Sequence, residues 1–318
     1  MVTSSLWMRL LLVLIGVSFV AGCSSSPNPY RYTVVFSQCN NSEPYRAAQN
    51  AAMKKLWGEQ ADVRLVVMDA QQDSVRQIAQ IETAIRMKPQ LLIVAPNERA
   101  PLTEVMKRAM EAHISVICLE RDIVEPYYTS WIRVDNRAIG RLIGQYVVDA
   151  LTKKYGEPRG NIVELAGLKG VEAEANRKLG AHDVWDTYPK IKVVTEAVAN
   201  WSQSLAKDRM TEILSAVPQI DVVYGRNDPM AVGAYLAARE RGREKEMIFV
   251  GIDGLSGEAG GVSKVREGIL AATCIYPLCV DKAVEVGTKI LHDPNFHPDK
   301  SFTISSRLIT PENAADTP

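Results

Sequence analysis

Residues 36–48 read FSQCNNSEPYRAA, and they join an apolar run to the beginning of a helical pattern. That run, YTVVFS from position 32, is rich in β-branched and aromatic side chains, which favours a buried strand. Pro44 suits the first turn of a helix, because an N–H at that position has no intrahelical partner. The stretch therefore predicts a strand, a polar loop and a helix. The loop is either an ordinary helix cap or one wall of a binding site.

Similar apolar segments recur along the chain with helical stretches between them. They start at positions 32, 63, 90, 114 and 130 in the first half and at 161, 191, 220, 247 and 269 in the second. The intervals, roughly 15 to 30 residues, leave room for a crossover helix. Because the runs are continuously apolar, their strands should be buried on both faces, as in a parallel sheet covered by helices. The sequence therefore predicts an α/β protein with two doubly wound, parallel-sheet lobes.

The overall composition is that of a globular protein. The chain has 318 residues, enough for one large or two medium domains, and 47% of them are hydrophobic. Lys and Arg together number 37, as do Asp and Glu, so the formal net charge is zero. A neutral chain has no general attraction to nucleic acid, and we expect no nucleic-acid partner.

The N-terminus has the layout of a secretory signal. Arg9 precedes an apolar run over residues 10–20 that is too short to cross a bilayer, and VAGC follows, ending at Cys23. This ending resembles the lipobox of bacterial lipoproteins, whose cleavage leaves a lipid-modified cysteine. We expect a signal peptide over residues 1–22, lipidation of Cys23 and a tether over residues 23–29. The alternative is a chance cysteine after an ordinary signal.

The remaining cysteines are Cys39, Cys118, Cys274 and Cys279. Their spacing is not that of a dense disulfide framework, and no CxxC motif is present. Cys118 and Cys274 lie in apolar runs, where a cysteine acts as a small buried apolar side chain. A disulfide among the four is the alternative.

Enzyme and metal signatures are nearly absent. The chain contains no GxSxG, GxxxxGK[ST] or GxGxxG motif, and its four histidines form neither HExxH nor a pair at ligand spacing with cysteine. We therefore predict no catalytic residue, no metal and no cofactor. One exception is Ser204 to Lys207, which fits the SxxK motif of penicillin-binding proteins and class A β-lactamases without its partner motifs SDN and KTG. It leaves a serine acyl-enzyme as a remote alternative.

Polar residues follow most of the predicted strands, and an open α/β sheet binds its ligand at these carboxyl ends. Asp69, Asp135 and Asp228 would serve equally well as helix caps or hinge residues. Glu120 and Arg121 do not suit capping, because a carboxylate–guanidinium pair is not an N-cap. This pair therefore favours a binding role.

Six motifs in one order give the chain a family resemblance. They are VVFSQCN…PYRAAQ, LLIVAPN, ISVICLERD, RVDNRAIGRLIGQY, YGRNDPMAVGAYLA and FVGIDG. Over residues 32–310 the chain resembles the type I periplasmic sugar-binding proteins of ABC transporters, and most of all their ribose- and galactofuranose-binding branch. The resemblance implies a monosaccharide held between two lobes, with no catalysis.

The resemblance also implies a set of ligand-binding residues. Tyr45 and Trp201 would stack on the sugar ring, and charged or amide side chains would bind its hydroxyls. Relatives can carry an arginine on the helix after LAGLKG, where this chain has Ala175, so Glu172 is expected to substitute weakly. The full predicted set is Ser37, Asn41, Tyr45, Arg46, Asn97, Glu120, Arg121, Glu172, Trp201, Asn227, Asp253 and Tyr276.

The implied topology crosses between the lobes three times, with hinge residues Asp135, Tyr276 and Ser305. The N-terminal lobe would comprise residues 30–134 and 277–304, and the C-terminal lobe residues 135–276 and 305–318.

The implied protein is a monomer, exported and anchored by its lipid on the periplasmic or extracellular side of a bacterial membrane. Sugar would close the lobes, and the closed form would dock on an ABC permease. A receptor feeding a chemoreceptor or histidine kinase is the alternative, because uptake and sensing differ only in the membrane partner. A LacI-type repressor core would need a helix-turn-helix where this chain has its lipobox-like sequence.

Overall fold

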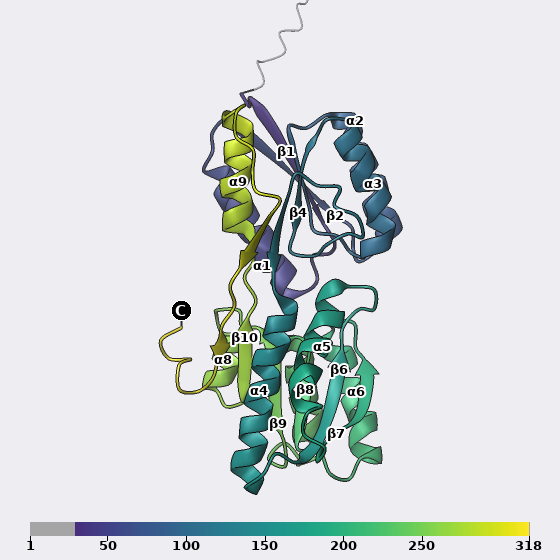
Figure 1. The fold of residues 1–318 in the computed structure, drawn as a ribbon, viewed down its shortest axis with the longest axis vertical. Coiled ribbons are helices and arrows are strands. Elements are labelled where there is room, and N and C mark those ends of the chain that lie inside the picture. Colours follow the sequence, from purple (N-terminus) through teal and green to yellow (C-terminus); the bar gives the residue numbers. More distant parts are fainter. Residues whose placement is uncertain (1–28, 318) are drawn as a thin grey trace, which may run out of the picture.

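The computed structural model describes residues 29–317. The predicted signal peptide, Cys23 and residues 24–28 of the predicted tether lie outside the described residues. In the described part, no helix is both long enough and apolar enough to span a membrane. Two lobes lie one above the other along the long axis of the molecule (Figure 1).

The N-lobe is built on a parallel sheet, six-stranded within the described residues, with the strand order β11-β5-β4-β3-β1-β2. Its elements are β1 (Tyr32–Gln38), α1 (Pro44–Gly58), β2 (Val63–Asp69), α2 (Ser74–Met87), β3 (Leu91–Val94), α3 (Arg99–Glu111), β4 (Ser115–Leu119), β5 (Ser130–Val134), α9 (Val280–His292) and β11 (Ser301–Ile304).

The C-lobe repeats this plan with the order β12-β10-β9-β8-β6-β7, again six strands among the residues described. All neighbours are parallel except β10 and β12. Its elements are α4 (Asn136–Tyr155), β6 (Gly160–Ala166), α5 (Glu172–Trp185), β7 (Ile191–Val198), α6 (Gln203–Ala216), β8 (Val222–Gly225), α7 (Asp228–Glu240), β9 (Ile248–Asp253), α8 (Gly261–Arg266), β10 (Ala272–Ile275) and β12 (Leu308–Ile309).

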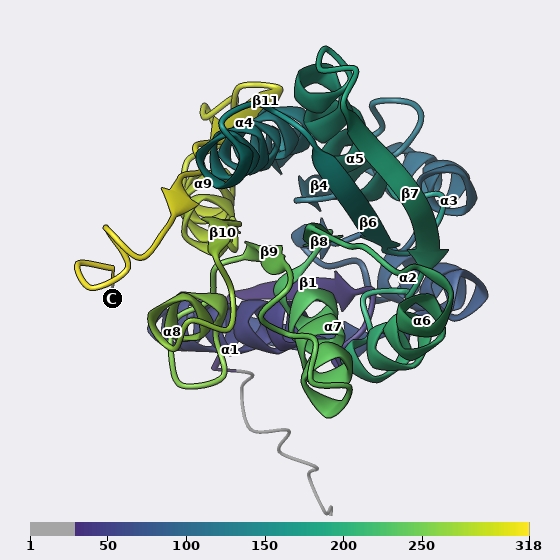
Figure 2. The ribbon, with the colours of Figure 1, turned by 90° about the horizontal axis from the view of Figure 1, so that it is seen from below.

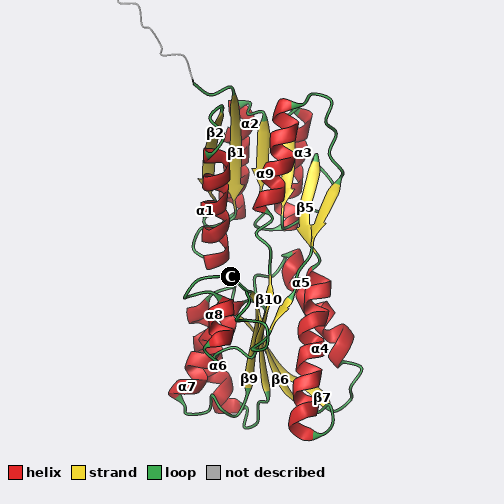
Figure 3. Ribbon diagram, turned by 90° about the vertical axis from the view of Figure 1, so that its left-hand side faces the viewer, coloured by secondary structure: helices red, strands yellow, loops and turns green. Residues whose placement is uncertain are grey.

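The continuous apolar strands are explained by cover on both faces. In β1, Val34 and Phe36 pack with Trp57 of α1, whereas Val35 between them packs with Ile81 of α2. Helices flank the strands on either side in both lobes (Figure 3). Viewed along the long axis, α4 and α5 cover one face of the C-lobe sheet, and α6, α7 and α8 lie on the other (Figure 2). Neither face of a central strand therefore meets water.

The chain passes between the two sheets in three segments. Asp135 lies between β5 and α4, Tyr276 between β10 and α9, and Ser305 between β11 and β12. Each of these three residues, predicted as hinges, thus lies where the chain leaves one lobe for the other. Asp135 also caps α4, because its carboxylate accepts the N–H of Ala138 at 2.9 Å.

The four cysteines of the described chain are buried and free. Cys118 and Cys274 lie in the core, as predicted from their apolar surroundings. The disulfide alternative is therefore not realised in this structure.

Candidate functional site

A narrow cavity of about 20 Å³ lies between the lobes, near the carboxyl ends of their strands. This volume has room for about one water molecule and is far below the roughly 300–1,000 Å³ of small-molecule sites, so a larger ligand needs the walls to move apart. Both lobes and one crossing segment contribute to its lining: Glu43, Tyr45, Arg46, Glu120, Arg121, Ala173, Arg177, Trp201, Asn227, Asp253 and Tyr276.

Eight of the twelve residues predicted from the sequence line this cavity. They are Tyr45, Arg46, Glu120, Arg121, Trp201, Asn227, Asp253 and Tyr276. The structure brings them together from segments far apart in the chain. Their contact with a ligand stays a prediction.

The other four predicted residues lie away from the cavity because other side chains or the main chain engage them. Ser37 is buried beneath α2 and accepts a hydrogen bond from Gln77 at 3.2 Å. Asn41 is exposed and accepts one from Asn50 at 2.7 Å.

Asn97 and Glu172 are turned toward local partners in the same way. The Asn97 amide donates to Ser74 Oγ at 2.9 Å and to the Gln72 carbonyl at 3.2 Å. The Glu172 carboxylate accepts from Asn136 at 3.1 Å and also from Asn176.

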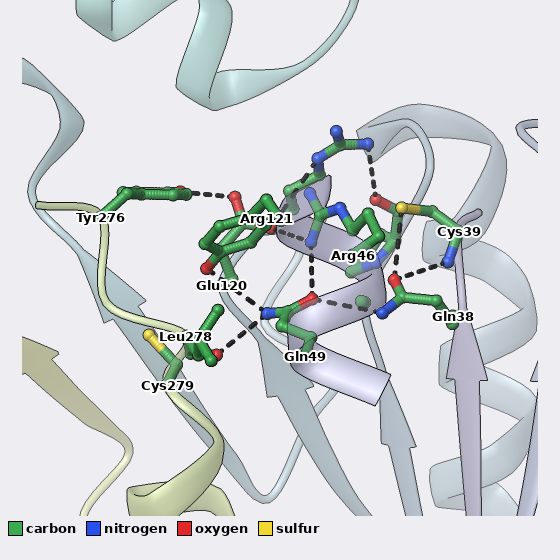
Figure 4. Close-up of polar contacts among 12 residues, drawn as sticks. Gln38, Cys39, Arg46, Gln49, Glu120, Arg121, Tyr276, Leu278 and Cys279 are labelled. Atoms are coloured by element: carbon green, nitrogen blue, oxygen red, sulfur yellow. Dashed lines mark hydrogen bonds and ion pairs between the residues drawn. The ribbon is translucent and has the colours of Figure 1, made fainter. Parts of the chain in front are cut away.

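The Arg46 guanidinium is held in place by Gln49, which lies on the same helix (Figure 4). Its Nη1 lies 2.7 Å from Oε2 of Glu120 and donates to Oε1 of Gln49, one turn further along α1, at 2.9 Å. Gln49 in turn donates to the Leu278 carbonyl at 2.9 Å and accepts from Gln38 at 3.2 Å. This network fixes the N-lobe wall of the cavity.

Glu120 follows β4 and joins this wall to a crossing segment. One carboxylate oxygen meets Arg46, and the other accepts the hydroxyl of Tyr276. Burial alone would raise the pKa of Glu120, but the charges of Arg46 and Arg121 and the Tyr276 hydrogen bond outweigh burial and lower it. Glu120 is therefore an ionised acceptor at neutral pH.

Two buried donors on the N-lobe wall make no hydrogen bond among the described residues, although one of them, Nε of Arg121, lies 3.8 Å from Oε2 of Glu120. They are Nε of Arg46 and Nε of Arg121. Nη1 of Arg121 is anchored on the Asn97 carbonyl at 3.0 Å, which fixes the guanidinium. An unpaired buried donor is costly, so these groups favour a ligand rich in hydrogen-bond acceptors.

Arg177 forms the centre of the C-lobe wall, and the sequence analysis did not find it. Its Nε donates to Asn136 Oδ1 at 3.1 Å, and its guanidinium carbon lies 4.3 Å from the centre of the Tyr276 ring. The arginine of the relatives was expected at the position of Ala175, which is exposed. Helical spacing could have indicated Arg177. Residues 173 and 177 are one turn apart and share a face of α5, and both line the cavity.

Asn227 supports the C-lobe wall in two directions. Its Oδ1 accepts the Met230 N–H at 2.9 Å and so caps α7, a role that the sequence analysis considered for Asp228. Its amide donates to the Trp201 carbonyl at 3.2 Å. The Trp201 ring lies close over Gly167, where a Cβ would be 2.2 Å from Cη2. Only glycine therefore fits beneath the ring.

The two aromatic rings predicted to enclose a sugar have different neighbours. The Tyr45 ring packs on Tyr276 with centroids 5.0 Å apart, and its hydroxyl donates to the Pro277 carbonyl at 2.8 Å. The Trp201 ring lies beside Arg177, 5.6 Å from its guanidinium carbon. The cavity therefore has an aromatic surface on each side, with Arg177 and Tyr276 between the two.

Asp253, at the end of β9, is the buried carboxyl group of the C-lobe wall. Burial raises the pKa of Asp253 well above its usual value, and although Arg177 at 4.0 Å opposes the shift, Asp228 adds to it. The buried arginines donate and the Glu120 carboxylate accepts, so the cavity offers both kinds of hydrogen-bond group.

Three cavity residues have unusual backbone angles. The φ values are +63° at Glu120, +66° at Trp201 and +138° at Asp253. Side chains other than glycine rarely adopt positive φ, and such strain is found mostly at functional sites. Contacts with the surrounding structure thus hold Glu120, Trp201 and Asp253 in backbone conformations that are unfavourable in a free loop.

Metal binding and a serine acyl-enzyme are two chemistries weighed from the sequence. Within residues 29–317, no group of three or more His, Cys, Asp or Glu side chains is placed to hold a metal ion. Lys207 of the SxxK motif pairs with Glu240 at 2.6 Å, and the Ser204 hydroxyl contacts that of Ser202. Serine and lysine therefore have separate partners, which gives no support to the acyl-enzyme alternative.

Comparison with known proteins agrees with this geometry. The model of the periplasmic binding protein domain matches residues 34–277. Galactofuranose-binding protein YtfQ of Escherichia coli (strain K12) is 28% identical over 322 residues, covering 98% of this chain and 97% of that protein. Ribose import binding protein RbsB of Bacillus subtilis (strain 168) is 25% identical over 271 residues, or 85% of each.

A solved structure is similar over the whole fold. The fructose-binding periplasmic domain of a hybrid two-component system has a TM-score of 0.84 and 34% identity, covering 90% of this chain and 92% of that one. The chain belongs to the periplasmic binding protein family, whose members are binding proteins that act outside the cytoplasm. The predicted fold class and the predicted ribose and galactofuranose branch are both confirmed.

Proposed function

We propose that this protein captures a monosaccharide between its two lobes and delivers it to an ABC permease without chemical change. The observation that carries the proposal is the interlobe cavity, which is lined by three buried arginines and two buried carboxyl groups, with two Nε donors that make no hydrogen bond. Sugar hydroxyls donate and accept at once, so they match such a mixed lining. The flat Tyr45 and Trp201 rings suit the mildly apolar C–H face of a sugar.

The ligand class is a pentose or hexose, in pyranose or furanose form. The names of the relatives point the same way, since they bind galactofuranose, ribose or fructose.

Binding would favour the form in which the lobes are closed. A ligand that contacts both walls at once stabilises the closed state over the open one by those differential contacts. Segments near Asp135, Tyr276 and Ser305 would serve as the hinge, with lobes of residues 30–134 with 277–304 and 135–276 with 305–318. The protein would act as a monomer.

Sensing is the second candidate function. It is favoured by the fructose-binding domain, which belongs to a two-component system and is 34% identical to this chain. Under this alternative the closed form would contact a membrane kinase or chemoreceptor in place of a permease. Co-purification of the sugar-loaded protein with a permease or with a kinase would separate the two functions.

The protein would be held on the outer side of a membrane by lipid on Cys23, after removal of residues 1–22. The lipobox-like VAGC supports this part of the proposal. Retention of a Cys23→Ser variant in the membrane fraction would contradict it.

Isothermal titration of the purified protein tests the binding function, after any co-purified sugar has been removed by unfolding and refolding. The panel is D-ribose, L-arabinose, D-fructose, D-galactose and D-glucose. At least one sugar should bind with a micromolar or lower Kd. Arg46→Gln should weaken that binding at least tenfold, because it removes a charge-assisted donor from the wall.

Lys54→Gln is the matched control, because Lys54 is exposed on the same helix. It should bind like the unmodified protein. Absence of binding to every sugar of the panel would overturn the proposed function.

A further inference from the structure

A second buried polar cluster lies behind the C-lobe wall. Arg226, at the end of β8, is 1% exposed and does not line the cavity. Its guanidinium is paired with three carboxylates from three different elements. These are Glu164 of β6 at 2.5 Å, Glu196 of β7 at 2.5 Å, and Glu174 of α5. These four residues are called the Arg226 cluster below.

The cluster reaches the cavity wall at two points. The Arg226 carbonyl accepts a hydrogen bond from Nη1 of Arg177 at 2.6 Å. Oε2 of Glu174 accepts the N–H of Gly167 at 2.6 Å, and Gly167 is the residue beneath the Trp201 ring. Residues of the cluster thus contact both Arg177 and the support of Trp201.

Stability alone does not account for such a cluster. Removing several charges from water is expensive, and well-packed apolar side chains of similar volume often stabilise a protein as much or more. A charged network fixes direction, however, because each guanidinium N–H donates only to an acceptor within a narrow range of positions. Here the ion pairs of the Arg226 guanidinium connect the end of β8 with β6, β7 and α5.

We propose that Arg226 is a positioning residue for the sugar site. By fixing the main chain between β8 and Asn227, its side chain aims its own carbonyl at Arg177 and holds that guanidinium in the cavity. The effect on ligand affinity rests on the proposed function, whereas the effect on Arg177 does not.

The decisive experiment needs no ligand. The Nε–Hε signal of Arg177 is recorded in ¹H–¹⁵N spectra of the full protein and assigned by its loss in Arg177→Lys. In Arg226→Met this signal should shift or broaden, because the carbonyl that holds the guanidinium is no longer fixed. Glu174→Gln removes a charge partner of Arg226 with little change of shape, and it should shift the signal in the same way.

Lys178→Met is the matched control. Lys178 pairs with Glu196 at 2.6 Å, so its loss perturbs the rim of the cluster without touching Arg226. An Arg177 signal that is unchanged in both Arg226→Met and Glu174→Gln overturns the proposal. The same holds if Lys178→Met moves the signal as far as they do.

Titration with D-ribose and with D-fructose adds a test of mechanism. Arg226→Met should weaken binding about tenfold in the unmodified background, since displacement of a ligand-contacting group by a fraction of an ångström is costly. In an Arg177→Ala background it should cost less than about threefold, because residues acting through one group are not additive. If Arg226→Met weakens binding by the same factor in both backgrounds, the proposal is overturned. If the unmodified protein binds neither sugar, that counts against the proposed function, and the Arg177 signal decides the positioning role.

Discussion

The Glu120 carboxylate is shared between partners from two distant parts of the chain. Arg46 of the first helix holds one oxygen at 2.7 Å, and Tyr276 of the crossing segment donates its hydroxyl to the other. The Tyr276 hydroxyl also accepts a hydrogen bond from Asn136 at 3.3 Å, and Asn136 accepts one from Arg177. A chain of polar contacts therefore runs from the N-lobe wall to the C-lobe wall through two crossing segments.

Loss of the Tyr276 hydroxyl should weaken sugar binding. In Tyr276→Phe, the ionised Glu120 loses a donor, and a hydrogen bond to a charged group contributes about 1.5–3 kcal/mol. We expect affinity to fall about tenfold or more in isothermal titration, with little change in far-UV circular dichroism. Tyr45→Phe is the control, because its hydroxyl donates to the Pro277 carbonyl and accepts from Gln49, both of which are neutral. Equal losses in the two variants would contradict this prediction.

At the level of elements, α4 and α5 pack closely because glycines line their contact. A Cβ on Gly140 would lie 2.4 Å from the Arg177 carbonyl, and one on Gly180 would lie 2.0 Å from the Arg137 carbonyl. The helices can therefore approach until their backbones touch. This close contact sets the distance of α5, and of the Arg177 side chain, from the crossing segment.

Gly140→Ala should therefore push α5 outward. The added methyl overlaps main-chain atoms that cannot move away alone, and we expect a loss of about 1–3 kcal/mol in the free energy of unfolding. Urea denaturation measures this loss. Gly58→Ala is the control, because nothing lies within 4 Å of a Cβ at that position. It should change stability by no more than about 0.5 kcal/mol.

For the molecule as a whole, sequence patterns predicted the layout better than the site. Continuous apolar runs such as VVF in β1 identify strands covered on both faces, and strand ends locate the cavity. The direction of a side chain depends on partners that the pattern does not contain. Asn97 is turned away by Ser74, and Arg177 is held by its hydrogen bond to Asn136 of α4. These contacts arise only once the elements have packed.

Acid should destabilise the whole protein through Glu164. Burial would raise the pKa of this carboxyl, but the His182 hydrogen bond and the Arg226 charge outweigh it and lower the pKa from 4.5 to about 2. Between these values the unfolded chain binds more protons than the folded one. Stability should therefore fall by up to about 3 kcal/mol as the pH drops from 4.5 to 2.

Urea denaturation at several pH values measures this effect. Glu164→Gln should have a flatter profile below pH 4.5 than the unmodified protein. The pKa of Glu285 is also lowered to about 2, by its hydrogen bonds to Lys282 and Lys289, but this carboxyl is exposed on α9. Solvent screens such a pair, so Glu285→Gln should leave the profile nearly unchanged. Identical profiles for Glu164→Gln and the unmodified protein would contradict the prediction.

The triple passage of the chain between the lobes has a consequence for biogenesis. The strands β11 and β12 complete one edge of each sheet, and both lie within residues 301–309. A growing chain that has been threaded across a membrane as far as α8 still lacks α9 and β11 of the N-lobe. Neither lobe can complete its sheet before residues 301–309 are available. Pairing between strands so far apart in the sequence slows folding. Final folding should therefore begin only after almost the whole chain has emerged on the far side.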